Sequence, residues 1–418
     1  MPKEIYLAGL DIGTANIRVV QAKLLQETGE LSVIGISEVP AAGIRRGVIV
    51  DIEEAVSSIS TALERCERMT GVPIISANVA ISGNHISSIA SHGVIAVSRA
   101  DGEISEADVV RAVDASQAIS IPPNKEVLHV FPKTFTLDGQ TGIKDPLGMT
   151  GIRLEVDSLI VQAGLPFVRN LSRAVMQGGI ELEDLVLSTC AASESVLSKR
   201  QKDLGAVLLD LGAGTTGLAV YEEGDLLHTA VLPVGSIHIT NDIAIGLRIS
   251  IETAEKVKVS FGHASPKEVG KNEEIDLSKL DSEETQNTSR QYVAEIIEAR
   301  LEEIFKMVND ELKSIDRAGK LPSGAVLTGG GSKLPGILEF AKKELKLPVS
   351  LGRPQNVSTV IDRVDDPAFS TAVGLVLWGG KFGQGRGFSA GQIGSFFKNI
   401  GSNKTLEKAK NWVKSFLP

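Results

Sequence analysis

Two similar glycine-rich stretches constrain the fold of this chain more than any other feature. One is AGLDIGTANIRVVQAKL from Ala8, and the other is LLDLGAGTTGLAVYEEG from Leu208. In each, an apolar run leads to Asp, an apolar residue, Gly and a nearby Thr before alternating apolar residues resume. This pattern predicts a β-hairpin with a tight turn. The spacing of about 200 residues is far too long for a solenoid repeat, so we expect two homologous halves whose turns share one cleft.

Both turns have the chemistry of a phosphate-binding loop. Glycine N–H groups can approach phosphate oxygens because no Cβ intervenes, and Thr hydroxyls add donors. Asp11 and Asp210 end the first strand of each hairpin, where a carboxylate can hold a hydrated Mg²⁺. An Asp-x-Gly sequence is also ordinary turn chemistry. For one hairpin both interpretations stay open, and the pair favours phosphate binding.

A third glycine-rich turn follows a predicted strand at AVLTGGGSKLPGILEFAKKEL, from Ala325. Gly329 to Gly331 would let a nucleoside lie against bare backbone, and the helix start that follows suits a phosphate or ribose. LPVGSIHITNDIA from Leu232 supplies another Gly-Ser turn before a helix.

Composition limits the class of protein. The 418 residues are 42% apolar and 23% charged, which predicts about two to four folded domains. The net charge of -9 argues against a nucleic-acid partner. Cys66 and Cys190 lie in apolar stretches, as expected of reduced thiols in the cytosol. We find no signal-peptide pattern, no spanning run of about 18 apolar residues and no transition-metal motif among the six histidines.

Periodicity predicts a helix after Asp51, its N-cap, and a long amphipathic helix from Gln291 to Ser314. The polar stretch from Gly262 to Arg290 is predicted to be a solvated loop or an exposed insertion. A separate α+β module is predicted from about Asn84 to Ile160. Its expected elements are strands over Gly93–Val97, Glu126–Phe131, Thr134–Leu137 and Leu154–Ile160, and a helix through Ile119 opened by a capping box at Ser105–Asp108.

These motifs together resemble the actin, Hsp70 and sugar-kinase superfamily, with two phosphate loops, the adenosine loop TGGGS and the connecting helix DDPAFSTAVGL. Within it the chain is most similar to the bacterial cell-division family FtsA. The narrower likeness lies in ISGNHI from Ile81, DGQTGIKDPLGM from Asp138, and LPVG with HITNDIA after Leu232. It covers nearly the whole chain. It implies an α/β, two-lobed actin-like (ribonuclease H-like) nucleotide-binding fold with an inserted small α+β subdomain and a C-terminal amphipathic helix.

The resemblance also implies a division of the chain. The core of lobe 1 would comprise 1–83, 162–195 and 365–378, with the inserted subdomain at 84–161. The core of lobe 2 would comprise 196–243 and 323–364, with its smaller subdomain at 244–322. A linker would follow at 379–403 and an amphipathic helix at 404–418. Eight of the 23 residues from Gly379 to Gly401 are glycine, which is typical of a flexible linker.

The family implies that ATP or ADP binds with Mg²⁺ between the lobes. Asp11 and Asp210 would position the phosphates and, through water, the metal. The implied phosphate-binding residues are Gly13, Thr14, Ala15, Asn16, Gly212, Ala213, Gly214, Thr215 and Thr216. The implied nucleoside-binding residues are Gly235, Glu255, Lys258, Gly329, Gly330, Gly331 and Ser332. Without the family, Glu255 and Lys258 read as an i,i+3 surface ion pair.

The chain departs from the family at Ser188. A Glu or Gln usually stands there, where it suits orienting the attacking water. Because Ser reaches less far, we expect slow or negligible hydrolysis and a nucleotide that mainly closes the lobes. No catalytic residue is assigned.

The stretch TLEKAKNWVKSFLP from Thr405 is the feature that best distinguishes a membrane-bound adaptor from the other possible functions of this chain. At about 100° per residue, one helix face gathers the apolar side chains and the other the lysines. The apolar face holds Leu406, Ala409, Trp412, Val413, Phe416 and Leu417, and the polar face holds Lys408, Lys410 and Lys414. Docking on the protein's own core stays open. The pattern favours a weak interfacial anchor on anionic lipid, at about 1 kcal/mol per Lys.

The resemblance implies a polymerising adaptor on the inner membrane face at the division septum. Its partners would be itself, membrane lipids, later division proteins and the C-terminal peptide of the tubulin-like protein FtsZ. Arg300 and Glu303 match the family's region for that peptide, although a solvated helix face fits them equally. The alternatives are a type IV pilus assembly ATPase, a small-molecule kinase and a chaperone ATPase. We find no second carboxylate and His cluster for a kinase.

Overall fold

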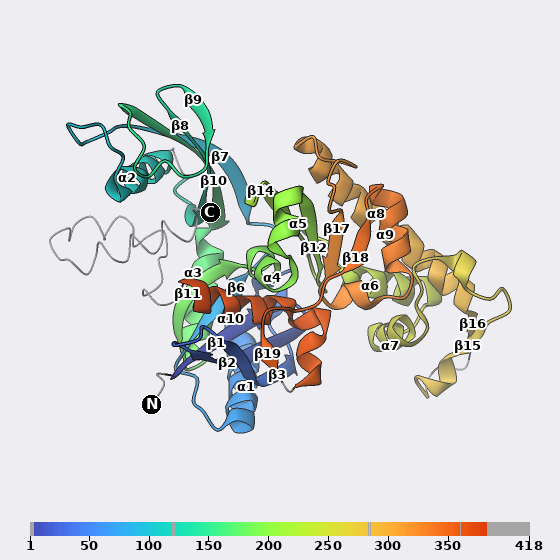
Figure 1. Cartoon of the computed structure of the whole chain (residues 1–418). Helices are drawn as coiled ribbons and strands as arrows, with labels where there is room; N and C mark the ends of the chain where they lie inside the picture. The colour runs from blue at the N-terminus through green and yellow to red at the C-terminus, as the bar shows by residue number, and fades with distance from the viewer. Residues whose placement is uncertain (1–3, 119–121, 283, 285, 360, 383–418) are drawn as a thin grey trace.

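The computed structural model describes residues 4–118, 122–282, 284, 286–359 and 361–382 (Figure 1). The predicted amphipathic helix at 404–418, with its membrane-contacting residues from Leu406 to Leu417, lies outside the described residues. So does most of the predicted linker. None of the helices within the described ranges is both long and apolar enough to cross a membrane.

The first sheet has the strand order β11-β6-β1-β2-β3-β19. The predicted hairpin forms its centre: β1 and β2 are antiparallel, β3 pairs antiparallel with β2, and β6 and β11 add in parallel. The strand bounds are β1 Glu4–Ile12, β2 Asn16–Leu25, β3 Leu31–Pro40, β6 Ser76–Ile81, β11 Glu181–Leu187 and β19 Ser358–Thr359.

The second sheet repeats this arrangement, with the order β14-β13-β12-β17-β18. Its first three strands are antiparallel, and β17 and β18 add in parallel beside β12. The bounds are β12 Ala206–Leu211, β13 Thr216–Glu222, β14 Asp225–Leu232, β17 Ala325–Thr328 and β18 Val349–Leu351. The prediction of two homologous halves is therefore confirmed in the topology.

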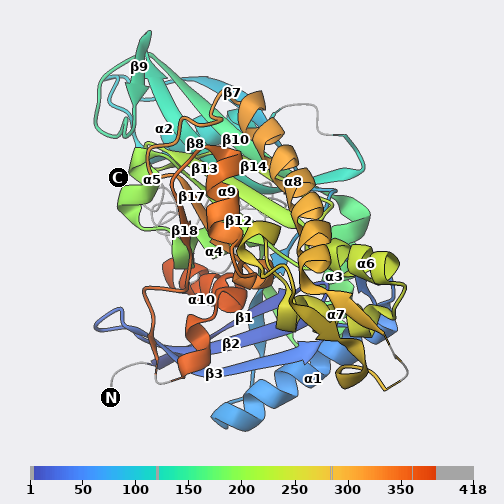
Figure 2. The ribbon, with the colours of Figure 1, turned by 90° about the vertical axis from the view of Figure 1, so that its right-hand side faces the viewer.

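Helices cover both faces of the first sheet. α1 (Ile52–Thr70) packs below β2 and β3, and α10 (Ser370–Phe382) lies on the opposite face across β1 and β2 (Figure 2). Asp51 caps α1 by accepting from the Glu54 N–H, as predicted. α10 also touches α4 (Ser188–Val196), and a Cβ added at Gly374 would lie 1.8 Å from the Ala191 carbonyl oxygen. The two helix backbones therefore meet at this glycine. α3 (Leu165–Gln177) packs beside α1.

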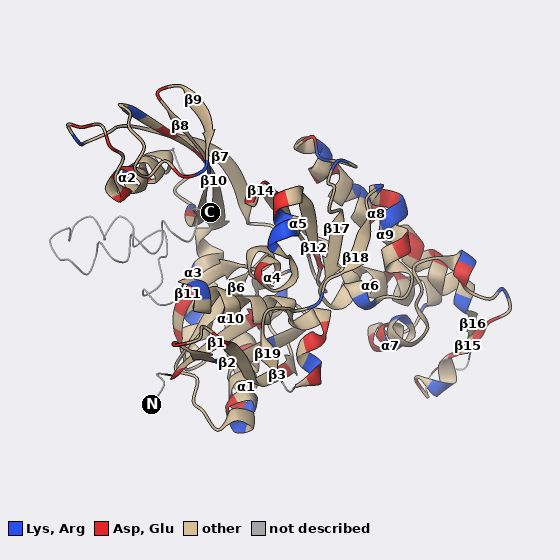
Figure 3. Ribbon diagram, in the orientation of Figure 1, with Lys and Arg blue, Asp and Glu red and all other residues tan. Residues whose placement is uncertain are grey.

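The second sheet carries α5 (Lys199–Leu204), α6 (Ser236–Leu247), α7 (Ile251–Phe261), α8 (Arg290–Ser314) and α9 (Ile337–Leu345). α8 begins one residue before the predicted helix, with Ser289 as its N-cap. Acidic and basic residues lie side by side along α1 and α8 (Figure 3).

Cys66 and Cys190 are buried free thiols, as predicted, and burial raises the pKa of each to about 12.

The stretch from Gly262 to Arg290 is more ordered than the predicted solvated loop. It contains β15 (Glu274–Asp276) paired with β16 (Asn287–Ser289) and the 3-10 turns η1 (Pro266–Glu268) and η2 (Leu277–Lys279). Ile275 and Leu277 are buried in the same core as α8. The solvated-loop alternative was wrong because a few well-spaced apolar residues anchor an otherwise charged segment, whereas the alternative of an exposed insertion stands.

The inserted α+β module forms a sheet of its own, in the order β7-β10-β8-β9, with its own core. The strands are β7 Ser87–Ala96, β8 Lys125–Leu137, β9 Gln140–Ile143 and β10 Arg153–Gly164. The predicted capping box at Ser105 is confirmed and opens α2 (Glu106–Ser116). Two details were wrong: the strands predicted over Glu126–Phe131 and Thr134–Leu137 are one strand, and α2 ends at Ser116 instead of Ile119.

Candidate functional site

The turns of the two central hairpins lie against each other. A Cβ added at Gly214 would lie only 2.6 Å from Thr14 Oγ1, so a glycine is needed for the second turn to approach the first this closely. Each turn is closed by the same backbone bond: Gly13 N–H donates to Asn16 O at 3.1 Å, and Gly212 N–H donates to Thr215 O at 3.0 Å. Two predicted phosphate loops, distant in sequence, are therefore neighbours.

Two buried carboxyl groups lie at the base of these turns. Asp11 is the penultimate residue of β1, and Asp210 is the penultimate residue of β12. Burial raises the pKa of Asp11 to about 7 and that of Asp210 to about 6, while the positive charge of Arg18 lowers both. The charge of Asp210 raises the pKa of Asp11 further. Because both carboxylates resist carrying charge together, a cation between them would stabilise the ionised pair.

The described residues contain no group of three His, Cys, Asp or Glu side chains that could hold a metal ion directly. Two aspartates beside glycine turns instead fit an ion that keeps most of its water and takes phosphate oxygens as further ligands, which is how Mg²⁺ binds. The residues present therefore fit a magnesium nucleotide better than a bare metal.

The triple-glycine turn lies beside the second of these hairpins. Gly329 follows β17 with φ of +81°, and a Cβ there would lie 2.3 Å from Asp210 Oδ1. Gly331, in the 3-10 turn η3 (Gly330–Lys333), packs on the Leu211 carbonyl. Gly330 differs, because a Cβ there would meet no atom within 4 Å. Ser332 is buried and donates to the Gly329 carbonyl at 2.7 Å, so its hydroxyl closes this loop.

The first turn of α6 packs directly on the second phosphate turn. Gly235 precedes α6, and a Cβ there would lie 2.6 Å from the Ala213 carbonyl oxygen. Glu255 and Lys258 on α7 pair at 2.7 Å, so the simple ion pair exists. Lys258 also donates to Thr240 Oγ1 at 2.8 Å and to the Ser236 carbonyl at 3.3 Å. Both side chains therefore reach the start of α6 beside the cleft.

Two predicted site residues are buried. The Thr216 hydroxyl is fully buried and donates to the Val234 carbonyl at 2.8 Å, so only its backbone is available to a phosphate. Ser188 is buried at the start of α4. Its neighbour Thr189 packs on the second hairpin, since a Cβ at Gly217 would lie 2.4 Å from Thr189 Cγ2. Gly217 pairs with Asp210 across that hairpin, which brings the start of α4 to the base of the cleft.

Arg300 and Glu303 lie elsewhere, on the surface of α8. Arg300 pairs with Asp242 of α6 at 2.6 Å and also contacts Glu303. They are not among the residues that meet at the two phosphate turns, and their role as a partner contact stays a prediction.

Sequence reasoning missed two groups at the cleft. Arg18 lies opposite Asp11 in the β1–β2 register, pairs with Glu38 at 2.7 Å, and leaves its buried Nε without a partner among the described residues. The hairpin of β4 (Ile44–Arg45) and β5 (Val48–Ile49) also reaches the first phosphate turn, because Gly47 N–H donates to Thr14 Oγ1 at 3.0 Å. Its signal was the Arg-Arg-Gly turn just before the Asp51 cap.

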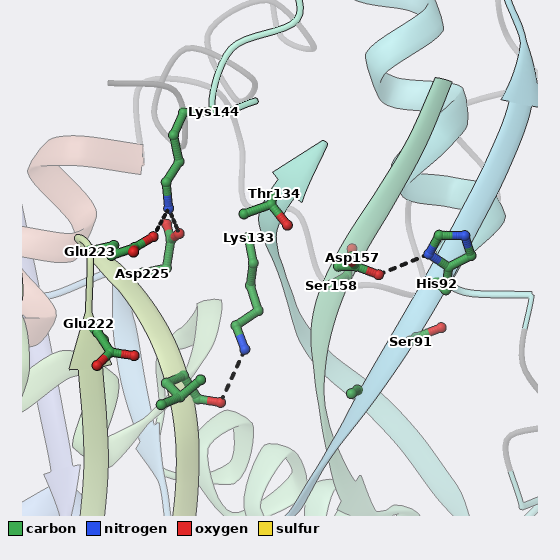
Figure 4. Close-up of a pocket in the computed structure, with 12 residues that line it drawn as sticks. Ser91, His92, Lys133, Thr134, Lys144, Asp157, Ser158, Glu222, Glu223 and Asp225 are labelled. Atoms are coloured by element: carbon green, nitrogen blue, oxygen red, sulfur yellow. Dashed lines mark hydrogen bonds and ion pairs between the residues drawn. The ribbon is translucent and has the colours of Figure 1, made fainter. Parts of the chain in front are cut away.

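A polar groove of about 490 Å³ separates the inserted module from lobe 2 (Figure 4). Lys144 crosses it to Asp225 at 2.5 Å and to Glu223 at 3.5 Å. Lys133 reaches the Leu227 carbonyl at 3.5 Å. These charged groups already have partners across the groove. We therefore interpret the groove as an internal interface between the inserted module and lobe 2, and not as a ligand pocket.

Solved structures with a similar fold have low sequence identity. The PilM-PilN type IV pilus biogenesis complex matches with a TM-score of 0.64 at 17% identity, over 89% of this chain and 98% of that one. MreB5 of Spiroplasma citri bound to ADP matches with a TM-score of 0.53 at 16% identity, over 89% and 95% of the two chains. At these identities the likeness shows the fold alone, which is the predicted actin-like one.

Sequence relatives are more specific. A model described as cell division protein FtsA matches residues 207–374, and one described as the SHS2 domain inserted in FtsA matches residues 83–162. Cell division protein FtsA of Pseudomonas aeruginosa is 38% identical over 97% of both chains. The Bacillus subtilis protein of that name is 40% identical over 89% of this chain and 83% of its own length. This chain therefore belongs to the FtsA family of cell division proteins, and its fold is actin-like.

Proposed function

We propose that this protein binds ATP or ADP with Mg²⁺ between its two lobes. The observation that carries the proposal is Gly330: it lies in a glycine turn beside Asp210, yet no protein atom fills the space where its side chain would be. Glycine at such a place fits close approach of a ligand to the backbone. MreB5 of Spiroplasma citri, whose fold is similar, is described bound to ADP and bound to AMPPNP. This supports a nucleotide as the ligand.

Each group in the cleft would have a distinct task. N–H groups of the turns at Gly13–Asn16 and Gly212–Thr215 would donate to phosphate oxygens. Asp11 and Asp210 would hold the hydration shell of Mg²⁺, and the ion supplies the positive charge that neutralises the phosphates. Gly329 to Ser332 would support the nucleoside, with Gly235, Glu255 and Lys258 across from it. A ligand touching both turns would stabilise the closed arrangement of the lobes.

We expect hydrolysis to be slow or negligible. Ser188 stands where a longer polar side chain would orient water, and it is buried at the start of α4. Turnover by purified wild type and by Ser188→Glu tests this expectation, and brisk hydrolysis by the wild type would overturn it.

The division function follows from the family. We propose that nucleotide binding promotes head-to-tail filaments on the inner membrane face at the septum, that the segment at 404–418 anchors them, and that Arg300 and Glu303 contact the FtsZ C-terminal peptide. The inserted subdomain would contact further copies and later division proteins. One short tail binds weakly, whereas linked tails can gain about 10²- to 10⁴-fold in avidity.

A pilus-assembly role is the second candidate, because PilM shares the fold over 89% of the chain. The division role is favoured, since the FtsA relatives have about twice the sequence identity of that structure.

Nucleotide titration of wild type and Gly330→Val tests the proposal. A Cβ at Gly330 would lie within 4 Å of no atom, so we expect the variant to unfold at nearly the same temperature. We expect its ATP affinity to fall about tenfold or more, because the side chain would occupy the ligand's space. Absence of ATP binding by wild type with Mg²⁺ would contradict the proposal.

A further inference from the structure

The turn of the β4–β5 hairpin has an unusual residue. Its two central residues, Arg46 and Gly47, have φ of +50° and +76°, which is the type I′ geometry of a two-residue hairpin. This geometry favours Asn-Gly, Asp-Gly or Gly-Gly. A long side chain in the left-handed region is unfavourable. Residues that break a local rule in this way concentrate at functional sites.

This turn is held at the junction of the two phosphate turns. A Cβ added at Gly214 would lie 2.9 Å from Arg46 Cα, so the Arg46 backbone packs directly on the second turn. Gly47 N–H donates to Thr14 Oγ1 of the first turn at 3.0 Å. On its other side, a Cβ at Gly47 would lie 3.2 Å from Gly83 N. Three sequence-distant segments therefore fix the turn beside the cleft.

The Arg46 side chain is exposed, and its guanidinium has no hydrogen-bond or ion-pair partner among the described residues. Arg18 and Arg300 differ, since each has a carboxylate partner within 2.7 Å. A planar guanidinium is the strongest side-chain partner of a phosphate group, because it donates two parallel hydrogen bonds. An unpaired arginine beside two glycine turns is thus complementary to a nucleotide phosphate.

We propose that Arg46 binds the γ-phosphate of ATP. This contact would let the cleft distinguish a nucleoside triphosphate from a diphosphate. This inference rests on the proposed nucleotide function. Arg46 lies on a hairpin that touches both phosphate turns, so its contact with the last phosphate would tie the hairpin and both lobes together only when that phosphate is present. A cation at this position beside both turns would offset the cost of the unfavourable backbone conformation.

Arg46→Asn tests the inference without endangering the fold, since Asn-Gly is a preferred type I′ turn. The variant should unfold at the same or a higher temperature than wild type. We expect its ATP affinity to fall about tenfold or more, as for a lost charge-assisted contact, while its ADP affinity changes by less than about twofold. Arg45→Asn is the matched control, because it removes the same charge from the neighbouring strand position and should leave both affinities unchanged.

Titration of wild type and both variants with ATP and ADP, each with Mg²⁺, separates the outcomes. Selective loss of ATP affinity in Arg46→Asn alone supports the inference. If Arg46→Asn retains wild-type ATP affinity, or if ATP and ADP weaken equally, the inference is overturned and the nucleotide function stands. Wild type that binds neither nucleotide overturns both.

Discussion

Arg300 of α8 and Asp242 of α6 form a two-point ion pair, with distances of 2.6 Å from Nε to Oδ2 and 2.9 Å from Nη2 to Oδ1. Glu303, one turn further along α8, contacts the same guanidinium. The pair joins α6 to α8, the helix that carries the predicted contact for the FtsZ peptide. Arg300 is therefore both part of the framework of this surface and a candidate contact on it.

Arg300→Glu should weaken binding of a labelled FtsZ C-terminal peptide and lower the free energy of unfolding by about 1 kcal/mol, because like charges would face each other on a partly exposed surface. The double variant Arg300→Asp with Asp242→Arg restores the ion pair with reversed polarity and should recover stability. Peptide affinity that stays low in the double variant identifies Arg300 as a direct contact. Equal affinity of wild type and Arg300→Glu would remove Arg300 from the interface.

His129 should make stability depend on pH. It is buried between Phe131 and Trp378, and its Nε2 accepts from Leu187 N–H at 3.1 Å. Burial lowers the pKa of His129 to about 4, whereas an unfolded His titrates near 6.5. The unfolded state then binds more protons between these values, so stability is complete above about pH 6.5 and falls toward pH 4, by about 3 kcal/mol.

Urea unfolding of wild type and His129→Gln from pH 4.5 to 7.5 measures this dependence. Burial raises the pKa of Asp184 to about 6, which acts in the opposite direction in both proteins, so their difference isolates the histidine. The same pH slope in both proteins would contradict the assignment.

Lys144→Glu should loosen the inserted module from lobe 2. The new carboxylate would face Asp225 and Glu223, so repulsion replaces attraction across the groove of Figure 4. We expect faster hydrogen exchange in β14 and in the facing part of β8, with the core of β12 unchanged. Lys320→Glu is a suitable control, because the partner of Lys320 within the described part of the chain is Asp316, four residues away. Unchanged exchange in β14 would mean that the ion pair does not hold the module.

Gly214→Ala should separate the two phosphate turns. Its Cβ would lie 2.6 Å from Thr14 Oγ1 and 2.9 Å from Arg46 Cα, so the turns must move apart at a cost of about 1 to 3 kcal/mol. Thermal unfolding and ATP titration should both show a loss. Adding Thr14→Ala should recover part of the stability, since it removes one of the two clashes. A Gly214→Ala variant as stable as wild type would show that the turns are not in firm contact.

Most of the fold could be predicted from short sequence motifs. The Asp-x-Gly turns, the Asp51 cap and the Ser105 capping box act within a few residues, and each predicted element is present. The prediction divided β8 into two strands, and Pro132 lies between them. In the structure a register shift opposite Asp157 and Ser158 accommodates that proline within one strand.

The parts of the cleft that the sequence did not predict depend on distant contacts. Arg46 and Gly214 are far apart in sequence, and nothing near either residue indicates that they touch. The Thr216 hydroxyl looked available for a phosphate, but the segment between β14 and α6 brings the Val234 carbonyl within hydrogen-bonding distance. The first contact is set by how the two lobes pack together and the second by the path of the chain after β14, and periodicity and turn residues specify neither.

Co-sedimentation of FtsZ with anionic liposomes tests the central claim most directly. Purified FtsZ would be mixed with vesicles, ATP and Mg²⁺, and either the full chain or a chain truncated after Trp378. We predict that FtsZ pellets with the vesicles only when the full chain is present, and that Arg300→Glu reduces the pelleted fraction. FtsZ that stays in the supernatant with the full chain, or pellets equally with the truncated one, would contradict the account.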